Sequence, residues 1–492
     1  MANFHALAHL SRLSDSLVQR LPLDRRDRRL LLAMVCAGLV LQSCAPDFAA
    51  LDASITSEGG AEASAEGESN AEAASGEAAS GEAAGAEAAG AETDQETVTV
   101  GLLHSLSGPL AISEAPLVDA ELMAIDEINA DGGVLGRQII PIKEDASSDW
   151  PTFAEKAEKL LNEREAVVLF GGLTSASRKA VLPVVRANNA LLWYPGAYEG
   201  QECDRHVFYT GATANQQVAP AVSWMVGNRG KTFFIVSSGD RTTHEIVKAQ
   251  VRDYGGKVAG EAYVPLVNGV KADMAPVMDD IKQALPEGGV IFNALVGNHN
   301  RAFFKALRTA GLSYEDYLVM SVRVAEEESY QIGANFTNEH YAAWPYFQSI
   351  DSAENKDFVT RFQAKYGSDR LVGAPMEAAY SAVHLWAQSV EAAQSFDTED
   401  VRNAAYGQTY AAPSGPVTIA TNHHTIRTAR IGKALDNGQF RILSTGEVPV
   451  EPTPWSQSLS ESKGFACDWS DPDKGERYAL ESEVVADDSA RQ

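Results

Sequence analysis

The chain of 492 residues is poor in positive charge. It has 40 Lys and Arg residues against 67 Asp and Glu residues, which gives a formal net charge of −27 at pH 7. So acidic a protein is repelled by nucleic-acid phosphates and by anionic lipid headgroups. Nucleic acid is therefore excluded as the main partner.

Cysteine is also scarce, and its spacing excludes the common metal sites. The four cysteines are Cys36, Cys44, Cys203 and Cys467, and none of them forms a close C-x-x-C pair. Cys36 lies inside an apolar run and Cys44 just after it, so only Cys203 and Cys467 belong to the folded part. These two either form one disulfide in an oxidising compartment or remain separate thiols.

The sequence lacks several motifs that are typical of enzymes. It has no G-x-S-x-G, G-x-G-x-x-G, P-loop or H-E-x-x-H pattern. His423 and His424 are adjacent, so on a strand they point to opposite faces and make a poor metal pair. Glu144, Asp145 and Asp149 lie in a loop that enters a helix, where acids oppose the helix dipole. We expect a binding protein rather than an enzyme, with no cofactor and no metal.

The apolar run near the amino terminus is too short to span a bilayer. Leu30–Leu41 has twelve residues, whereas a span takes about 20, but this length is typical of the apolar region of a signal peptide. Four arginines at positions 25–29 stand directly before it, and Leu41–Cys44 resembles a bacterial lipobox. We therefore expect residues 1–43 to be a lipoprotein signal peptide, with a membrane lipid on Cys44. An ordinary signal peptide or an uncleaved anchor with a chance cysteine is the alternative, and Arg28-Arg29 leaves twin-arginine export open beside Sec.

Residues 44–96 lack both basic and large apolar side chains in their central part. Residues 45–96 have thirteen acids and no base, and from residue 57 they are almost wholly Ala, Glu, Gly and Ser. Such a composition offers no apolar stripe for packing, so we predict a disordered acidic tether. At about 5 to 6 Å times the square root of its length, the tether would reach roughly 35 to 40 Å.

From residue 97 the pattern changes to alternating strands and helices. The first expected series is strand 97–103, helix 117–129, strand 138–144, helix 151–163, strand 166–170, helix 176–187 and strand 191–194. The second is strand 231–236, helix 245–254, strand 257–264, helix 274–284, strand 289–293, helix 300–310 and strand 317–321. Repeated strand–helix units predict an α/β fold with parallel sheets covered by helices. Two series predict two doubly wound lobes.

In such sheets a ligand binds beyond the carboxyl ends of the strands. The loops at these ends are 105–108, 171–175, 194–198, 237–243 and 297–300, and they are rich in hydroxyls, amides and glycine. Ser175 is expected to cap the helix that begins at Ala176, where its hydroxyl and the free backbone N–H groups could receive a carbonyl oxygen. Capping alone is the alternative role for this serine.

Seven segments of the folded part share a pattern with one known family. They are Val100–Trp150, Thr174–Pro183, Trp193–Gly200, Phe208–Gln217, Ala325–Glu328, Tyr341–Asp351 and Asn422–Gly432. These segments resemble the urea and short-chain-amide binding proteins of bacterial ABC transporters, which are relatives of the branched-chain amino-acid receptors. The resemblance implies a type I periplasmic-binding-protein fold, in which two lobes joined by a three-strand hinge close on a small neutral ligand.

The resemblance also implies where the lobes meet. The chain would cross between them near Asn215, near Trp344–Phe347 and near Pro413–Pro416. Lobe I would then comprise residues 97–216 plus 346–412, and lobe II residues 217–345 plus 413–450. Residues 451–492 would form a C-terminal tail that wraps the surface before a disordered acidic end.

The implied ligand site matches the family only in part. Ser175, Tyr194 and Tyr198 match, whereas Leu173, Gly196 and Asn298 replace residues of the family pattern, and Gly196 and Leu173 would widen the pocket. Thr174 and Ser107 complete the expected ligand-binding set. The implied function is that of an exported, lipid-anchored protein that captures urea or a short amide and delivers it to permease subunits. A branched-chain or small amino acid as ligand, or a sensing role for a signalling partner, remains the alternative.

Overall fold

The computed structural model describes residues 96–239, 241–266 and 272–480. The chain divides into two units, residues 1–88 and 89–492, and the description below concerns the second. The signal peptide, the lipidated Cys44, nearly all of the tether and residues 481–492 lie outside the described residues. Expectations for these segments stay predictions.

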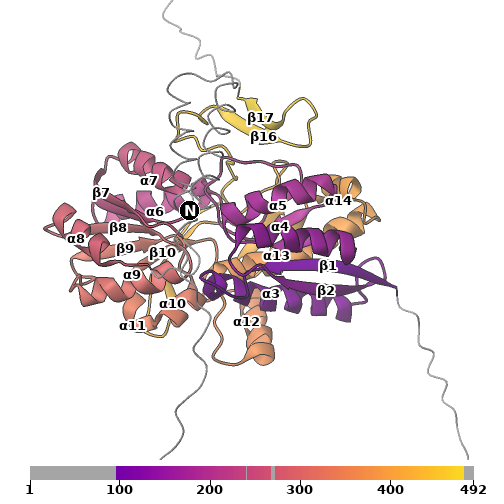
Figure 1. The fold of residues 1–492 in the computed structure, drawn as a ribbon, viewed down its shortest axis with the longest axis horizontal. Helices are drawn as coiled ribbons and strands as arrows, with labels where there is room; N and C mark the ends of the chain where they lie inside the picture. Colours follow the sequence, from indigo (N-terminus) through magenta and orange to yellow (C-terminus); the bar gives the residue numbers. More distant parts are fainter. Residues whose placement is uncertain (1–95, 240, 267–271, 481–492) are drawn as a thin grey trace, which may run out of the picture. The chain divides into compact units, whose positions relative to one another are not determined.

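Lobe I is built on a five-stranded parallel sheet of order β2-β1-β3-β4-β5 (Figure 1). Its strands are β1 (Thr97–His104), β2 (Gln138–Asp145), β3 (Leu169–Gly171), β4 (Leu192–Tyr194) and β5 (Val207–Tyr209). Its helices are α3 (Ala111–Ala130), α4 (Trp150–Glu158), α5 (Ser175–Ala187), α12 (Ala353–Tyr366), α13 (Ala374–Ala393) and α14 (Thr398–Ala405). A π-helical turn, η1 (Lys159–Glu163), extends α4.

Lobe II is built on a seven-stranded sheet of order β15-β14-β10-β9-β8-β6-β7. Its strands are β6 (Thr232–Ser237), β7 (Lys257–Tyr263), β8 (Gly289–Ala294), β9 (Tyr317–Ser321), β10 (Tyr341–Trp344), β14 (Arg430–Ala434) and β15 (Phe440–Thr445). The first five are parallel, and β14 and β15 add antiparallel strands at one edge. Its helices are α6 (Ala214–Asn228), α7 (Arg241–Asp253), α8 (Ala275–Ala284), α9 (Asn298–Thr309), α10 (Glu326–Ile332) and α11 (Ala334–Thr337).

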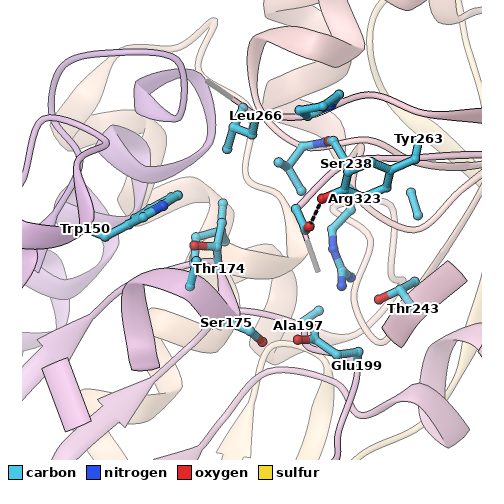
Figure 2. A pocket seen from close by; sticks show the side chains of 16 residues that line it. Trp150, Thr174, Ser175, Ala197, Glu199, Ser238, Thr243, Tyr263, Leu266 and Arg323 are labelled. Atoms are coloured by element: carbon cyan, nitrogen blue, oxygen red, sulfur yellow. Dashed lines mark hydrogen bonds between the residues drawn. The ribbon is translucent and has the colours of Figure 1, made fainter. Parts of the chain in front are cut away.

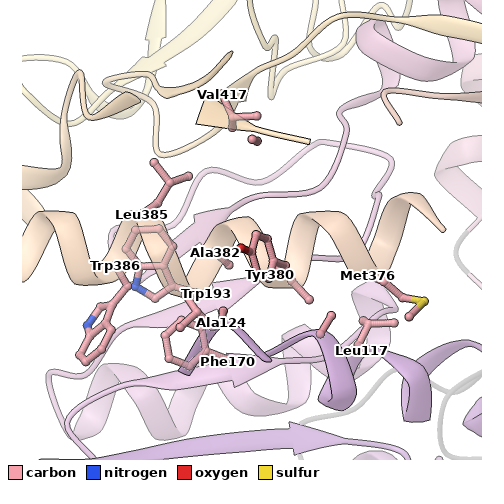
Figure 3. Packing of buried hydrophobic residues seen from close by; sticks show 14 of the residues in the cluster. Leu117, Ala124, Phe170, Trp193, Met376, Tyr380, Ala382, Leu385, Trp386 and Val417 are labelled. Carbon is pink, nitrogen blue, oxygen red and sulfur yellow. The ribbon is translucent and has the colours of Figure 1, made fainter. Parts of the chain in front are cut away.

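Buried side chains on both faces of each sheet explain why helices cover both sides. On β4 the side chain of Trp193 packs in the cluster formed with α3 and α13, whereas its neighbour Leu192 packs in the cluster formed with α4 and α5. This alternation is the period of two of a strand. Figure 3 shows the first cluster, where Phe170 and Trp193 of the sheet meet Trp386 of α13. The α/β fold with parallel sheets covered by helices, expected from the sequence, is confirmed.

The helix expected at 117–129 begins earlier than the sequence pattern suggests. Pro116 is typical of a helix start, but α3 already begins at Ala111 and includes this proline. The loop before it is consequently short, and it brings Pro109 against lobe II, where the carbonyl of Pro109 accepts from the N–H of Asn298 at 3.0 Å.

The third crossing between the lobes lies later than expected. We placed it near Pro413–Pro416, but β12 (Gly415–Ile419) pairs with β11 (Thr409–Ala412), and β13 (Thr425–Ile426) pairs with β12. Val417 and Ile419 are buried in the lobe I core. The chain therefore leaves lobe I only after β13, because these apolar side chains find their burial there.

Two arginines fix this late crossing. Arg427 donates to Glu377 of α13 at 2.8 Å, in an ion pair that is buried on both sides. Arg430 donates to the carbonyl of Ser414 at 2.9 Å and also to that of Pro345, which belongs to the second crossing. The crossings are therefore joined by side-chain contacts as well as by the chain.

The C-terminal tail is attached to lobe I by a disulfide. Cys203, between β4 and β5, is bonded to Cys467 with Cα atoms 6.5 Å apart. Cys467 belongs to a hairpin of β16 (Phe465–Asp468) and β17 (Gly475–Ala479). A second attachment is the N–H of Gln201, which donates to the carbonyl of Pro454 at 2.7 Å.

Removing this disulfide should destabilise the protein. The bond links residues 264 positions apart, so it restricts the unfolded chain strongly, and disulfides typically contribute about 2–4 kcal/mol. We expect the double variant Cys203→Ser with Cys467→Ser to lose about that much free energy of unfolding in urea denaturation. The reduced wild type serves as the control and should match the variant. A loss under about 0.5 kcal/mol would contradict the prediction.

Candidate functional site

A cavity of about 180 Å³ lies between loops of the two lobes (Figure 2). The lobe I lining consists of Trp150, Leu173, Thr174, Ser175, Ala176, Ala197 and Glu199. The lobe II lining consists of Ser238, Gly239, Thr243, Tyr263, Pro265, Leu266, Ala294, Val296 and Arg323. Most of these residues follow the carboxyl ends of strands, which is where the parallel sheets were expected to bind a ligand.

The start of α5 presents unpaired donors to this cavity. Thr174, not Ser175, is the N-cap: its hydroxyl accepts from the N–H of Ser177 at 3.1 Å, and Ser177 bonds back to Thr174. The expected cap at Ser175 was wrong by one residue, because the helix begins at Ser175 itself. Ser175 is 4% exposed, and its buried hydroxyl has no hydrogen-bond partner among the described residues. This hydroxyl and the free N–H groups of the first helical turn can donate to a ligand oxygen.

Tyr194 and Tyr198 match the family pattern but do not line the cavity. The hydroxyl of Tyr194 donates to the carbonyl of Leu173 at 2.6 Å, so this tyrosine supports the loop that leads into α5. The hydroxyl of Tyr198 contacts His424 and donates to the carbonyl of Glu202 at 3.2 Å. Burial raises the pKa of both phenols, which keeps them neutral.

Gly196 does not widen the cavity as expected. A Cβ at this position would lie 2.6 Å from the carbonyl oxygen of Leu173 and 2.6 Å from the Tyr194 hydroxyl. The space beside this glycine is therefore filled by the hydrogen bond between these two residues. The glycine is needed for packing rather than for ligand size.

Ser107 and Asn298 lie outside this cavity. The Ser107 side chain is exposed and donates to Asp145 at 2.7 Å, within lobe I. Asn298 begins α9 and borders a separate open groove with Arg301 and Arg370. Of the eight residues expected to bind ligand, the cavity thus brings together Leu173, Thr174 and Ser175.

Two charged residues of the cavity were missed from the sequence. Glu199 stands one position beyond the loop 194–198, and its side chain is 5% exposed. Arg323 follows β9 by two residues, and the loop after this strand was not among those inspected. Each stands in a loop that follows the carboxyl end of a strand, but the sequence does not show that the two loops face one cavity.

The adjacent histidines pack against aromatic rings. His424 stacks on Tyr209 with ring centroids 4.2 Å apart, and His423 stacks on Phe208 at 4.4 Å. Burial lowers the pKa of each imidazole to about 3, so both are neutral. Both rings are fully buried. Within residues 96–239, 241–266 and 272–480, no group of three potential metal ligands is found.

Comparison with known proteins identifies a family. The model described as "Periplasmic binding protein domain" matches residues 98–461. A leucine-, isoleucine-, valine-, threonine- and alanine-binding protein of Pseudomonas aeruginosa is 27% identical over 331 residues, which cover 65% of this chain and 85% of that protein. A limonene hydroxylase of Geobacillus stearothermophilus is 35% identical over 123 residues, which cover 25% of this chain and 23% of that protein. So short a match carries no conclusion about activity.

Solved structures show the same fold. A solute-binding protein of an ABC transporter from Rhodopseudomonas palustris BisB5, in complex with 3,4-dihydroxybenzoic acid, has a TM-score of 0.65 at 19% identity and covers 72% of this chain and 99% of its own. The branched-chain amino-acid protein LivJ of Streptococcus pneumoniae, in complex with isoleucine, has a TM-score of 0.61 at 19% identity and covers 72% of this chain and all of its own. In the part of the chain that is described, no helix combines the length and the apolar character of a membrane span.

A side chain at Gly196 should disturb this site. Gly196→Ala places a methyl group against the Leu173 carbonyl and the Tyr194 ring, and such overpacking typically costs about 1–3 kcal/mol. We expect that loss in the free energy of unfolding from urea denaturation. Gly227→Ala is the matched control, since nothing lies within 4 Å of its Cβ position. Equal stability of the two variants would contradict the packing role.

Proposed function

This chain belongs to the periplasmic binding protein domain family, and on that premise we propose that it is the solute-binding component of an ABC importer, with urea or a short-chain amide as its ligand. The observation that carries the proposal is the Ser175 hydroxyl, buried and without a partner at the start of α5, in a cavity lined by both lobes. A ligand oxygen would supply the missing partner. The comparisons support the transport role through the names of the relatives.

The cavity offers the groups that urea or an amide needs. Urea has one carbonyl acceptor and two NH₂ donors and carries no charge. Ser175 and the first N–H groups of α5 can donate to the carbonyl, and the Glu199 carboxylate on the same lobe can accept from an NH₂ group. At about 30 Å³ per molecule, 180 Å³ holds about six waters, which suits a small solute.

A small amino acid is the second candidate ligand. It is favoured by the opposite charges of Glu199 and Arg323, which come from different lobes and line the same cavity. An ammonium group would lie near the carboxylate, and the ligand carboxylate near the guanidinium or the start of α5. The curated relative from Pseudomonas aeruginosa carries the name of an amino-acid binding protein.

Closure of the two lobes is the proposed mechanism of delivery. A ligand that touches α5 on lobe I and Arg323 on lobe II binds the closed form more tightly than the open form, and only this difference shifts the equilibrium. The closed form would be what the permease subunits recognise. We further propose export and a lipid anchor on Cys44, in line with the family but resting on the amino-terminal sequence alone.

Loss of the Ser175 hydroxyl should weaken ligand binding. We expect calorimetry to detect binding of urea, acetamide, formamide or a small amino acid to the purified protein. Urea itself should bind no more tightly than tens of micromolar, because a ligand of four heavy atoms gains at most about −6 kcal/mol. Ser175→Ala should weaken whichever ligand binds by about 1–3 kcal/mol.

The exposed serine Ser223 of α6 provides the control for this test, since Ser223→Ala removes a hydroxyl far from the cavity lining. Unchanged affinity in Ser175→Ala would assign Ser175 to the helix start alone. Absence of heat from every solute would overturn the ligand class while leaving the fold.

The lipid anchor is tested by metabolic labelling. Cells that express the chain should incorporate radioactive palmitate into it, because the Cys44 thiol is the predicted site of lipid attachment. The Cys44→Ser variant should lose the label, whereas Cys36→Ser should keep it. Equal labelling of the wild type and Cys44→Ser would contradict the lipobox prediction.

A further inference from the structure

Arg323 is a charged group in the cavity that forms no ion pair with the residues that the structure describes. It follows β9 on lobe II, and Figure 2 shows its side chain reaching from that side of the cavity towards Ala197 and Glu199. One nitrogen, Nη1, donates to Gln217 Oε1 at 3.1 Å and to the carbonyl of Val322 at 3.0 Å. No ion pair joins Arg323 to a carboxylate of the described residues.

Two fully buried arginines, Arg178 and Arg427, differ from the half-buried Arg323 in this respect. Arg178 donates to Glu202 at 2.6 Å and Arg427 to Glu377 at 2.8 Å. Burial alone would lower the pKa of Arg178, but Glu202 raises it well above its ordinary value. Burial lowers the pKa of Arg323, and the attraction of the Glu199 carboxylate does not raise this pKa back to its ordinary value. The guanidinium of Arg323 therefore lacks the carboxylate partner that Arg178 and Arg427 each have within the described residues.

A neutral amide does not satisfy all of the polar groups around the cavity. Donors lie on both sides, with Ser175 and the start of α5 on lobe I and Arg323 on lobe II, while Glu199 is an acceptor. Glu199 already has a partner in the protein, but a carboxylate has about four lone-pair positions and can accept further bonds. The complementary ligand thus has two acceptor groups, one of them anionic, and an N–H donor.

We propose that the ligand is a short carboxylate bearing an amide or ureido group, with its carboxylate held by Arg323, its carbonyl by Ser175 and the α5 N-terminus, and its N–H by Glu199. This inference rests on the proposed function and narrows its ligand class. Urea or acetamide leaves Arg323 without an anion. An α-amino acid has a single acceptor group and leaves one of the two donor positions unfilled, which costs about fivefold to 150-fold in affinity.

The test compares matched ligands by calorimetry on the purified full chain. The probes are N-carbamoylglycine, its neutral primary amide, urea and glycine. The wild type should bind N-carbamoylglycine at least about tenfold more tightly than each of the other three, because only this probe fills both donor positions and the acceptor. Malonamate, which has an amide in place of the ureido group, should behave in the same way.

Substitutions of Arg323 distinguish a loss of recognition of the ligand's carboxylate from a general effect on folding. Arg323→Gln should weaken N-carbamoylglycine by about tenfold to 100-fold, while affinity for the neutral amide changes by less than about twofold. Arg323→Lys keeps the charge and should recover part of the loss. The control is Arg252→Gln, on an exposed residue of α7 that does not line the cavity, and it should bind every probe like the wild type.

Each other outcome has a definite meaning. The inference is overturned if the neutral amide or glycine binds as tightly as N-carbamoylglycine, or if Arg323→Gln weakens all probes equally. Binding of urea without binding of N-carbamoylglycine would overturn this inference and leave the proposed function intact. Absence of binding by all probes, together with the amides of the earlier test, would overturn both.

Discussion

The lobe I wall of the cavity depends on one buried ion pair, between Arg178 and Glu202. Arg178 lies on α5 one turn after Ser175, and Glu202 belongs to the loop that carries Ala197 and Glu199. The Arg178 guanidinium also packs 4.7 Å from the ring of Tyr194 and equally near that of Tyr198. Removing one partner of a buried pair typically costs about 3–5 kcal/mol. This ion pair therefore fixes the start of α5 relative to the neighbouring loop. The rings of Tyr194 and Tyr198 pack against the guanidinium.

The C-terminal segment extends this constraint to the second lobe. The disulfide at Cys467 attaches the segment to the same loop of lobe I. Leu459 packs into the lobe II core beside α6 and α7, and Ser458 bonds to Gln250 of α7. A change in the angle between the lobes must therefore be absorbed within a short stretch of chain between these two attachments. The C-terminal segment thus contacts both lobes: the loop of lobe I that carries Glu199 and Cys203, and helix α7 of lobe II.

The sequence predicted most of the fold and little of the site. Short apolar and β-branched runs placed β1–β4 and β6–β9 within a few residues, whereas β5, β10, β14 and β15 were not predicted as strands. The third crossing was misplaced because it was inferred from the family resemblance, whereas the pairing of β12 with β11 and of β13 with β12 keeps this segment on lobe I. Ser175 was found because hydroxyls at strand ends are visible in the sequence. Glu199 and Arg323 were missed because their importance comes from facing one cavity from two lobes, a relation between distant segments that no local pattern contains.

The distribution of these polar groups over two lobes links ligand recognition to the proposed closure of the lobes. Ser175 and Glu199 belong to lobe I, whereas Arg323 belongs to lobe II, so the complete set of partners exists only when the lobes are close together. On the proposed mechanism, water would solvate the guanidinium more fully in an open form, and a ligand anion would replace part of that water on closure. An empty closed form would then carry a desolvation cost that a filled one avoids. Arg323 would oppose closure without a ligand as well as select the ligand, and both effects would arise from the same charge.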